Sequence, residues 1–361
     1  MLKTLASEKK VVPDTITGRE VWQMTSGEPK SVSCYQEVEA FTDDERFVVF
    51  SSDRSGTFQL YRAELESGEI AQLSEIDEFR SISFGMSRNG REAIYTAGWR
   101  VYAVDVASGD DRVLLDFEGK IPSQPSGAPV ALSGTGDRVV VAYRPDDAST
   151  ILAIGILDTG DFEEVCRWEG ALSHAQICPG DGNLITFDPG PDTQNDMSLP
   201  QDKRARTWVC DASTGATRPF LVMPKGFRAT HEYWDRNGDR LYFHKKSHGT
   251  WTPTTISSID RSGKDWKDHY ESQDRKLGHS SIDRDSKFLV SDVQSSEENE
   301  IYRIDLVTGK ADLLCWPNTS PIQDQTIHVH PSISAQGNFV DFTSDRKGSS
   351  DLYVYPLQQD E

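Results

Sequence analysis

Four of the eight histidines of this chain share one position in a repeated pattern, seven or eight residues before the small residue of a predicted tight turn: His174, His231, His279 and His330. His328 lies two residues before His330, and Gln325 lies three before His328. Imidazole nitrogens and amide oxygens are ligands that suit divalent first-row metals. An imidazole that binds no metal can act as a base, since its ordinary pKa is about 6.5. The pattern therefore predicts a metal site with a general base.

An insertion of 18 residues, 189–206, separates two predicted strands of the fourth repeat. A loop of this length in a compact repeat is a candidate lid or wall for a substrate. It carries Lys203, Arg204 and Arg206 in an otherwise acidic chain. We expect Lys203 and Arg204 to be solvated. Arg206, at the start of a strand, is placed to hold a carboxylate through its two-pronged guanidinium.

Seven repeats must position these residues, and their copies begin near residues 41, 85, 131, 177, 233, 281 and 332. Each copy contains short β segments joined by turns such as Asn-Gly and Ser-Gly. A period near 45 residues with four such segments is typical of propeller blades. We predict an all-β, seven-bladed β-propeller that forms a single domain over residues 1–361. The last copy lacks its fourth strand, and residues 18–27 are expected to supply it.

The first strands of propeller blades surround the central axis, so the four repeated histidines should converge there. Three other histidines, His244, His248 and His269, occupy different positions in the repeat. We expect these three at the surface.

The charge and composition exclude several classes of protein. The chain has 58 acidic and 38 Lys or Arg residues, a net charge of −20 and a pI of about 4.8. Such acidity disfavours binding to nucleic acid or to an anionic membrane. The mean hydropathy is −0.56 and no long apolar run occurs. Eight Trp, 11 Tyr and 15 Phe supply a core, which argues against disorder.

The five cysteines are widely spaced and include no Cys-x-x-Cys pair, so we expect buried, reduced thiols. The N-terminus shows no apolar segment typical of a signal peptide, which predicts a cytoplasmic location. A closed propeller needs no second copy, so a monomer is compatible with the sequence, which is otherwise silent on oligomeric state.

Several strings resemble the oligogalacturonate lyases of polysaccharide lyase family 22. They are LSHAQICPGDGNLITFDPGP, RARTW, THEYWDRNGDRLYF, GHSSIDRDSKFLVSD and QTIHVHPSISAQGNFVDFTSD. The similarity is strongest from about residue 170 to the end. The Gln-x-x-His-x-His-Pro-Ser string, about a hundred residues after Thr-His-Glu-Tyr-Trp, is specific, because a generic propeller has no reason to carry both.

The resemblance implies a set of site residues. It assigns a Mn²⁺ ion to four ligands: His279, Gln325, His328 and His330. It makes His231 the base, and Arg206 and His174 substrate-binding residues. Tyr35 and Gln36 match a substrate-binding Tyr-Gln of the family. The His-Arg pair that precedes this Tyr-Gln in the family is replaced here by Val32-Ser33-Cys34.

The activity that the resemblance implies is β-elimination on short uronate oligosaccharides from pectin. The base removes the C5 proton, the glycosidic oxygen leaves from C4, and a C4–C5 double bond forms. From the residues alone, Mg²⁺, Co²⁺ and Ni²⁺ remain alternatives to Mn²⁺. Two other functions stay open: a lyase of the same fold for a different uronate oligosaccharide, and a non-catalytic propeller that binds a protein or glycan.

Overall fold

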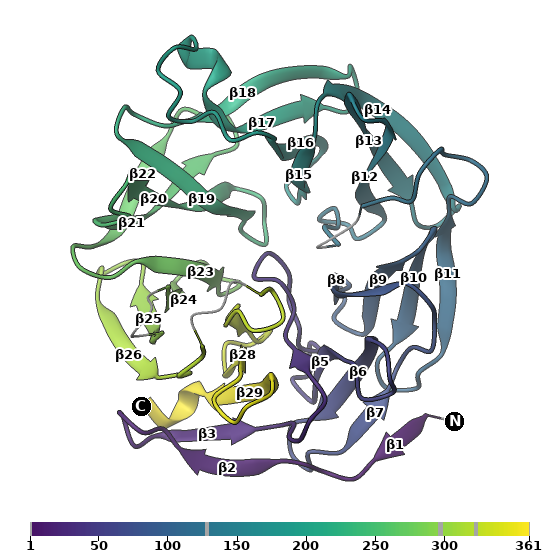
Figure 1. Cartoon of the computed structure of the whole chain (residues 1–361), viewed down its shortest axis with the longest axis vertical. Coiled ribbons are helices and arrows are strands. Elements are labelled where there is room, and N and C mark those ends of the chain that lie inside the picture. The colour runs from purple at the N-terminus through teal and green to yellow at the C-terminus, as the bar shows by residue number, and fades with distance from the viewer. Residues whose placement is uncertain (1, 127–129, 295–298, 321–323, 361) are drawn as a thin grey trace. The chain divides into compact units, whose positions relative to one another are not determined.

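The computed structural model describes residues 2–126, 130–294, 299–320 and 324–360. Apart from two short 3₁₀ turns, η1 (Gln201–Lys203) and η2 (Leu357–Asp360), the regular structure of these residues is β-strand. The strands form seven separate sheets (Figure 1). This arrangement confirms the prediction of an all-β chain with the seven blades of a β-propeller fold. None of the described residues forms a helix with the length and apolar character that a membrane crossing needs.

The first three sheets contain β1 and the strands from β4 to β14. Blade one has the order β1-β7-β6-β5-β4, from β1 (Lys3–Leu5), β4 (Ser31–Val32), β5 (Phe47–Ser52), β6 (Gln59–Glu64) and β7 (Ile70–Gln72). Blade two runs β11-β10-β9-β8, from β8 (Phe79–Met86), β9 (Glu92–Ala97), β10 (Arg100–Asp105) and β11 (Asp111–Asp116). Blade three contains β12 (Arg138–Asp146), β13 (Ser149–Ile156) and β14 (Asp161–Glu169).

The next three sheets are simple meanders in chain order. Blade four contains β15 (Leu172–Cys178), β16 (Asp181–Pro189), β17 (Ala205–Asp211) and β18 (Ala216–Val222). Blade five contains β19 (Phe227–Trp234), β20 (Arg240–Ser247), β21 (Thr254–Asp260) and β22 (Trp266–Ser272). Blade six contains β23 (Leu277–Ile282), β24 (Phe288–Val293), β25 (Ile301–Asp305) and β26 (Ala311–Cys315).

The last sheet joins both ends of the chain. Its order is β2-β3-β29-β28-β27, from β2 (Lys10–Pro13), β3 (Glu20–Gln23), β27 (Ser332–Ile333), β28 (Phe339–Ser344) and β29 (Asp351–Pro356). The strand β3 lies within residues 18–27 and pairs with β29 through Trp22 and Gln23.

The chain divides into two compact units, each with its own core. Unit 1 comprises residues 1–97, 103–112 and 275–361, and unit 2 comprises residues 98–102 and 113–274. The single-domain organisation stays a prediction. Every predicted metal ligand belongs to unit 1, whereas the predicted base and the substrate arginine belong to unit 2.

The repeated turns form because a side chain at their first position accepts hydrogen bonds from the backbone. Asp283 accepts from the N–H groups of Lys287 and Phe288, and Ser334 accepts from those of Asn338 and Phe339. These bonds satisfy donors that the turn leaves without ladder partners. They fix where the second strand of each blade begins, and therefore the register of the first strand.

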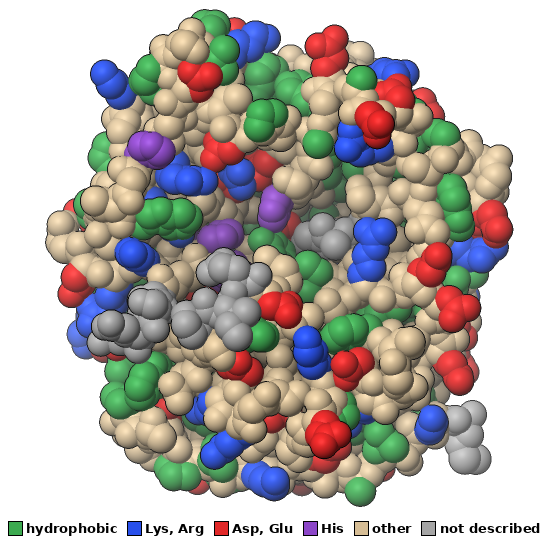
Figure 2. Space-filling view, viewed as in Figure 1, with side chains coloured by type: hydrophobic (Ala, Val, Ile, Leu, Met, Phe, Trp, Pro, Cys, Tyr) green, Lys and Arg blue, Asp and Glu red, His purple; other side chains and the backbone are tan. Residues whose placement is uncertain are grey.

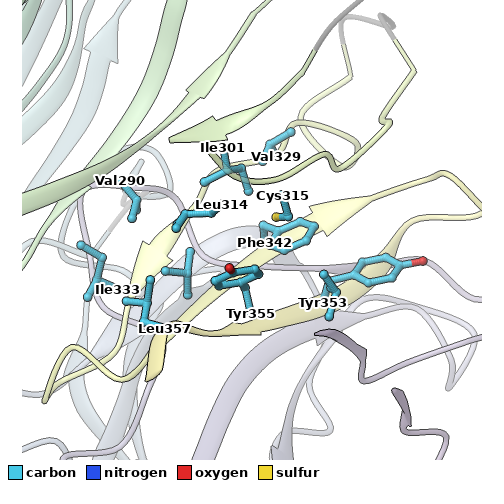
Figure 3. Packing of buried hydrophobic residues seen from close by; sticks show 12 residues of the cluster. Val290, Ile301, Leu314, Cys315, Val329, Ile333, Phe342, Tyr353, Tyr355 and Leu357 are labelled. Atoms are coloured by element: carbon cyan, nitrogen blue, oxygen red, sulfur yellow. The ribbon is translucent and has the colours of Figure 1, made fainter. Parts of the chain in front are cut away.

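The core of unit 1 lies beside the candidate metal ligands. Its cluster includes Val290, Ile301, Phe342 and Tyr353 (Figure 3). Phe342 and Tyr353 are direct cross-strand partners whose rings stack with centroids 5.5 Å apart, a pairing that stabilises adjacent strands. Val329 joins the same cluster, so the segment that carries His328 and His330 is anchored by the residue between them.

Candidate functional site

The histidines of blades four and five lie at identical irregularities of their first strands. The registers place two residues opposite one there: His174 and Ala175 opposite Phe187, and His231 and Glu232 opposite Phe243. Such β-bulges redirect a side chain and are common beside active sites. His174 and His231 also have positive φ values of 51° and 58°. A positive φ is uncommon for residues other than Gly, so its recurrence at the same position marks these two histidines as candidates for a site.

Blade six has the same bulge one residue earlier. Gly278 and His279 together oppose Asp292, so Gly278 takes the place that His174 and His231 occupy in their blades. His279 is therefore the second residue of its bulge, and its φ is not positive. The repeat predicted equivalent positions for these histidines, and the structure separates His279 from the other two by this one-residue shift.

Three histidines of unit 1 form the candidate metal centre. One ring nitrogen from each of His279, His328 and His330 lies within 4.8 Å of the others. The ring centroids of His279 and His330 are 4.3 Å apart, and those of His328 and His330 are 5.4 Å apart. His279 and His330 are buried, and His328 is half-buried. Sequence reasoning predicted all three as ligands, and the structure brings them together.

The chemistry of these rings fits a cation. Both ring nitrogens of His330 and Nδ1 of His328 are buried without a hydrogen-bond partner among the described residues. An unsatisfied buried polar atom is expensive, and a metal ion would satisfy it. Burial, followed by the neighbouring His279, lowers the pKa of His328 and lowers that of His330 well below its ordinary value. Both rings are thus neutral at pH 7, which is the form that binds a metal.

Three other predicted site residues of unit 1 lie outside the histidine triad. The Tyr35 ring is buried edge-on against His330, with centroids 4.8 Å apart, so Tyr35 packs on the triad itself. Gln36 is buried, and neither atom of its amide has a hydrogen-bond partner in the described part of the chain. Gln325 lies exposed on the turn that leads to His328. Its role as a fourth ligand stays a prediction.

Arg206 lies at the centre of an ionic cluster in unit 2. Its Nε and Nη2 donate to the two carboxylate oxygens of Glu232, at 2.9 and 3.1 Å, and Nη2 is 2.7 Å from Asp188 Oδ2. The fork that the sequence predicted for a substrate carboxylate is thus occupied by a residue of the chain. Nη1 is the guanidinium nitrogen with no hydrogen bond to any described residue. A further carboxylate could therefore contact Arg206 only through Nη1.

The two acids beside Arg206 were not predicted, and both are almost fully buried. Burial and the neighbouring Glu232 raise the pKa of Asp188 to about 7, although Arg206 and His174 act in the opposite direction. Burial disfavours the charge of Arg206, but Glu232 and Asp188 outweigh it and raise the Arg206 pKa above its ordinary value. Asp188 could have been recognised from the sequence as the last residue of a buried strand directly before the insertion.

The environment of His231 corrects one expectation. His244 was expected at the surface, but it is fully buried, and its ring meets that of His231 edge-on with centroids 5.8 Å apart. The reason is strand alternation, because His244 shares a buried face of β20 with Tyr242 and Lys246. His269 is also half-buried and lies 2.8 Å from the Ser258 hydroxyl. His248 is exposed, as predicted.

The insertion of blade four is anchored to β19, the strand of His231. Gln194 is buried and forms two hydrogen bonds with the Ala229 backbone, accepting from its N–H at 2.7 Å and donating to its carbonyl at 3.2 Å. Arg228 adds an ion pair of 2.9 Å with Asp192. These contacts hold the insertion against β19. Of the two predicted roles, the wall of a site and a mobile lid, they favour the wall. The wall also carries the exposed Lys203.

Acidic side chains are dispersed over the face of the molecule that Figure 2 draws. On the face drawn in Figure 2, acidic and basic side chains alternate over the described surface, and histidines are visible among them. Dispersed charge of this kind favours solubility. The local charge of a site then depends mainly on the residues that line it.

Comparisons with known proteins agree with the resemblance. No protein-family model matches the chain. An oligogalacturonide lyase of Pectobacterium atrosepticum is 23% identical over 94% of both chains. An oligogalacturonate lyase of Dickeya dadantii is 23% identical over 98% of this chain and 97% of its own.

Two solved structures have the same fold over nearly their whole length. An oligogalacturonate lyase in complex with manganese has a TM-score of 0.86 at 20% identity, covering 99% of this chain and 98% of its own. The oligogalacturonate lyase of Vibrio parahaemolyticus has a TM-score of 0.85 at 20% identity and the same coverage. The comparisons thus confirm the resemblance to oligogalacturonate lyases along the whole chain, and with it the seven-bladed propeller fold.

Proposed function

We propose that the protein is a metal-dependent lyase that cleaves short uronate oligosaccharides, of the oligogalacturonide type, by β-elimination. The observation that supports this most strongly is the triad of His279, His328 and His330, in which both ring nitrogens of His330 and Nδ1 of His328 are buried without a partner among the described residues. The similarity to two lyases over nearly the whole chain supplies the reaction class.

The triad fits a divalent first-row metal, and we propose Mn²⁺ because a solved relative is described in complex with manganese. His279, His328 and His330 would hold it, with Gln325 as a fourth ligand. When bound, such a cation neutralises the uronate carboxylate and so stabilises the negative charge that develops when the C5 proton leaves.

The remaining steps belong to side chains of unit 2. His231 takes the C5 proton on an imidazole nitrogen, and its bulge holds the ring away from the regular strand direction. Arg206 orients the substrate through Nη1, while Glu232 and Asp188 hold its other edges. His174, Tyr35 and Gln36 complete the proposed substrate contacts. No water is consumed, so the carboxylate pair of a glycoside hydrolase is not required.

The substrate, partners and location follow from this proposal. The substrate is a small anionic oligosaccharide, and neither nucleic acid nor a membrane takes part. We place the enzyme in the cytoplasm, in agreement with its reduced thiols.

The test is the ultraviolet absorbance of the new C4–C5 double bond. We expect it to rise when purified protein with added Mn²⁺ meets digalacturonate or trigalacturonate, and to be abolished by a chelator. Parallel assays with glucuronate and rhamnogalacturonan oligomers identify the preferred uronate. A protein that binds such oligomers without any rise in absorbance would be a non-catalytic propeller, and the lyase proposal would be wrong.

A further inference from the structure

The carboxylate of Asp292 faces His279 from the neighbouring strand. Asp292 Oδ2 lies 2.9 Å from His279 Nδ1, and Oδ1 accepts a hydrogen bond of 2.5 Å from the His279 backbone N–H. Both side chains are almost fully excluded from solvent, at 3% exposure each. One carboxylate therefore fixes both the ring and the backbone of a single candidate ligand.

The bulge of blade six creates this contact. Because Gly278 and His279 together oppose Asp292, the His279 N–H is displaced from the regular ladder and meets the Asp292 side chain instead. Gly278 leaves the space that the carboxylate needs, since a Cβ at this position would overlap Asp292 Oδ1 and Gln294 Cγ. The local sequence thus provides both the contact and the room for it.

We infer that Asp292 is a positioning residue for the metal centre. A carboxylate facing Nδ1 favours the tautomer with the proton on Nδ1, and this tautomer leaves the lone pair on Nε2 for the cation. The same contact fixes the rotation of the ring. Asp292 acts through His279, because its two oxygens are already directed at the backbone and ring of that residue. The inference depends on the proposed function only for the presence of a metal.

Metal affinity tests the inference without any substrate. We expect Asp292→Asn to weaken Mn²⁺ binding about 10- to 100-fold, measured by calorimetric titration of metal-free full-length protein. Asp351→Asn is the matched control, because Asp351 is an equally buried acid of unit 1 that hydrogen-bonds Gln23 and Thr25 instead. Its Mn²⁺ affinity should equal that of the wild type. Equal affinities for Asp292→Asn and wild type, or equal losses in both variants, would overturn the inference.

Two spectroscopic measurements separate positioning from simple structural support. The absorption spectrum of bound Co²⁺ should change in Asp292→Asn, since the orientation of one ligand changes, and should not change in Asp351→Asn. In the wild-type protein, NMR correlation of the histidine ring protons and nitrogens should show the Nδ1–H tautomer of His279. This measurement needs neither a metal nor a variant. Finding the Nε2–H tautomer would contradict the inference even if the lyase proposal is right.

Discussion

Arg206 and Glu232 form a two-pronged ion pair in which Nε and Nη2 of the guanidinium each donate to one carboxylate oxygen. Asp188 adds a second carboxylate on the same side. The guanidinium is therefore fixed in direction and its charge is compensated inside the protein. A residue held this way can orient a substrate carboxylate with little loss of side-chain entropy.

Removing Arg206 should destabilise the fold. Arg206→Met leaves two buried carboxylates without their cation, which typically costs about 3–5 kcal/mol in the free energy of unfolding. Chemical denaturation measures this loss. Adding Glu232→Gln and Asp188→Asn to Arg206→Met should recover much of it, because no uncompensated charge then remains buried. As a control, Arg167→Met removes the solvent-exposed pair with Asp146 and should cost less than about 1 kcal/mol. Equal losses at both sites would contradict the account of the cluster.

His231→Ala should abolish most of the lyase activity and leave the metal in place. Loss of a general base typically lowers kcat about 10²- to 10⁴-fold. We expect a small change in KM and no change in Mn²⁺ affinity, because His231 is not a proposed ligand. His248→Ala, an exposed histidine of the same blade, should behave as the wild type. A normal kcat for His231→Ala would assign the base to another residue.

The repeat predicted the blades, and His174, His231 and His279 lie on the first strands of theirs, because turn residues such as Asp283 fix the start of every second strand. His330 lies two residues before the first strand of its blade. The repeat could not predict the bulge that begins at Gly278 in one blade and at His231 in another. A shift of one residue changes the direction of a side chain without changing the sequence pattern.

The sequence also could not predict which residues surround Arg206 and His231. Glu232 reads as an ordinary polar residue beside His231, and its contact with Arg206 depends on how two blades of unit 2 meet. The burial of His244 could not be inferred from its strand, because its face of β20 also carries Tyr242 and Lys246, a polar pattern that usually faces solvent. Its position in the repeat gave no indication of burial either, since the repeat records turns and not which face of a strand is covered.

Replacing a triad histidine should remove the stabilisation that a metal provides. A ligand that binds only the folded state adds about 2.7 kcal/mol at a concentration 100 times its Kd. We expect Mn²⁺ to raise the Tm of the wild type and not that of His328→Ala or His330→Ala, with elemental analysis showing no retained metal. His269→Ala, which changes a half-buried histidine of unit 2, should keep the Mn²⁺-dependent rise. A metal-dependent Tm in both triad variants would place the cation elsewhere.

Gln194→Ala should release the insertion of blade four. The change leaves the N–H and carbonyl of Ala229 without their side-chain partner, at a cost of about 1–3 kcal/mol. We expect faster cleavage by trypsin after Lys203 or Arg204 and a higher KM for oligosaccharides. Gln201→Ala alters an exposed residue of the same insertion and should change neither. Unchanged proteolysis of Gln194→Ala would show that other contacts hold the wall.

Asp341 should make the protein less stable as the pH rises. It is fully buried in unit 1, accepts a hydrogen bond from Ser33, and has no described partner for Oδ1. Burial raises the pKa of Asp341 to about 7, whereas its ordinary value is about 4. Between these two pH values the unfolded chain has lost the proton that the folded protein still holds, so the contribution of Asp341 to stability falls from about pH 4 to about pH 7.

Asp341→Asn should remove this penalty. A difference of three pKa units corresponds to a change in the free energy of unfolding of at most about 4 kcal/mol. The variant should therefore gain stability over the wild type as the pH rises and keep the gain above pH 7. Urea denaturation at pH 5 and pH 8 measures the difference. Asp211→Asn is the control, because hydrogen bonds from Ser213 lower the pKa of this exposed acid. The Asp211→Asn variant should not gain stability over the wild type at high pH. A pH-independent difference between Asp341→Asn and wild type would mean that Asp341 is already charged in the folded protein at pH 5.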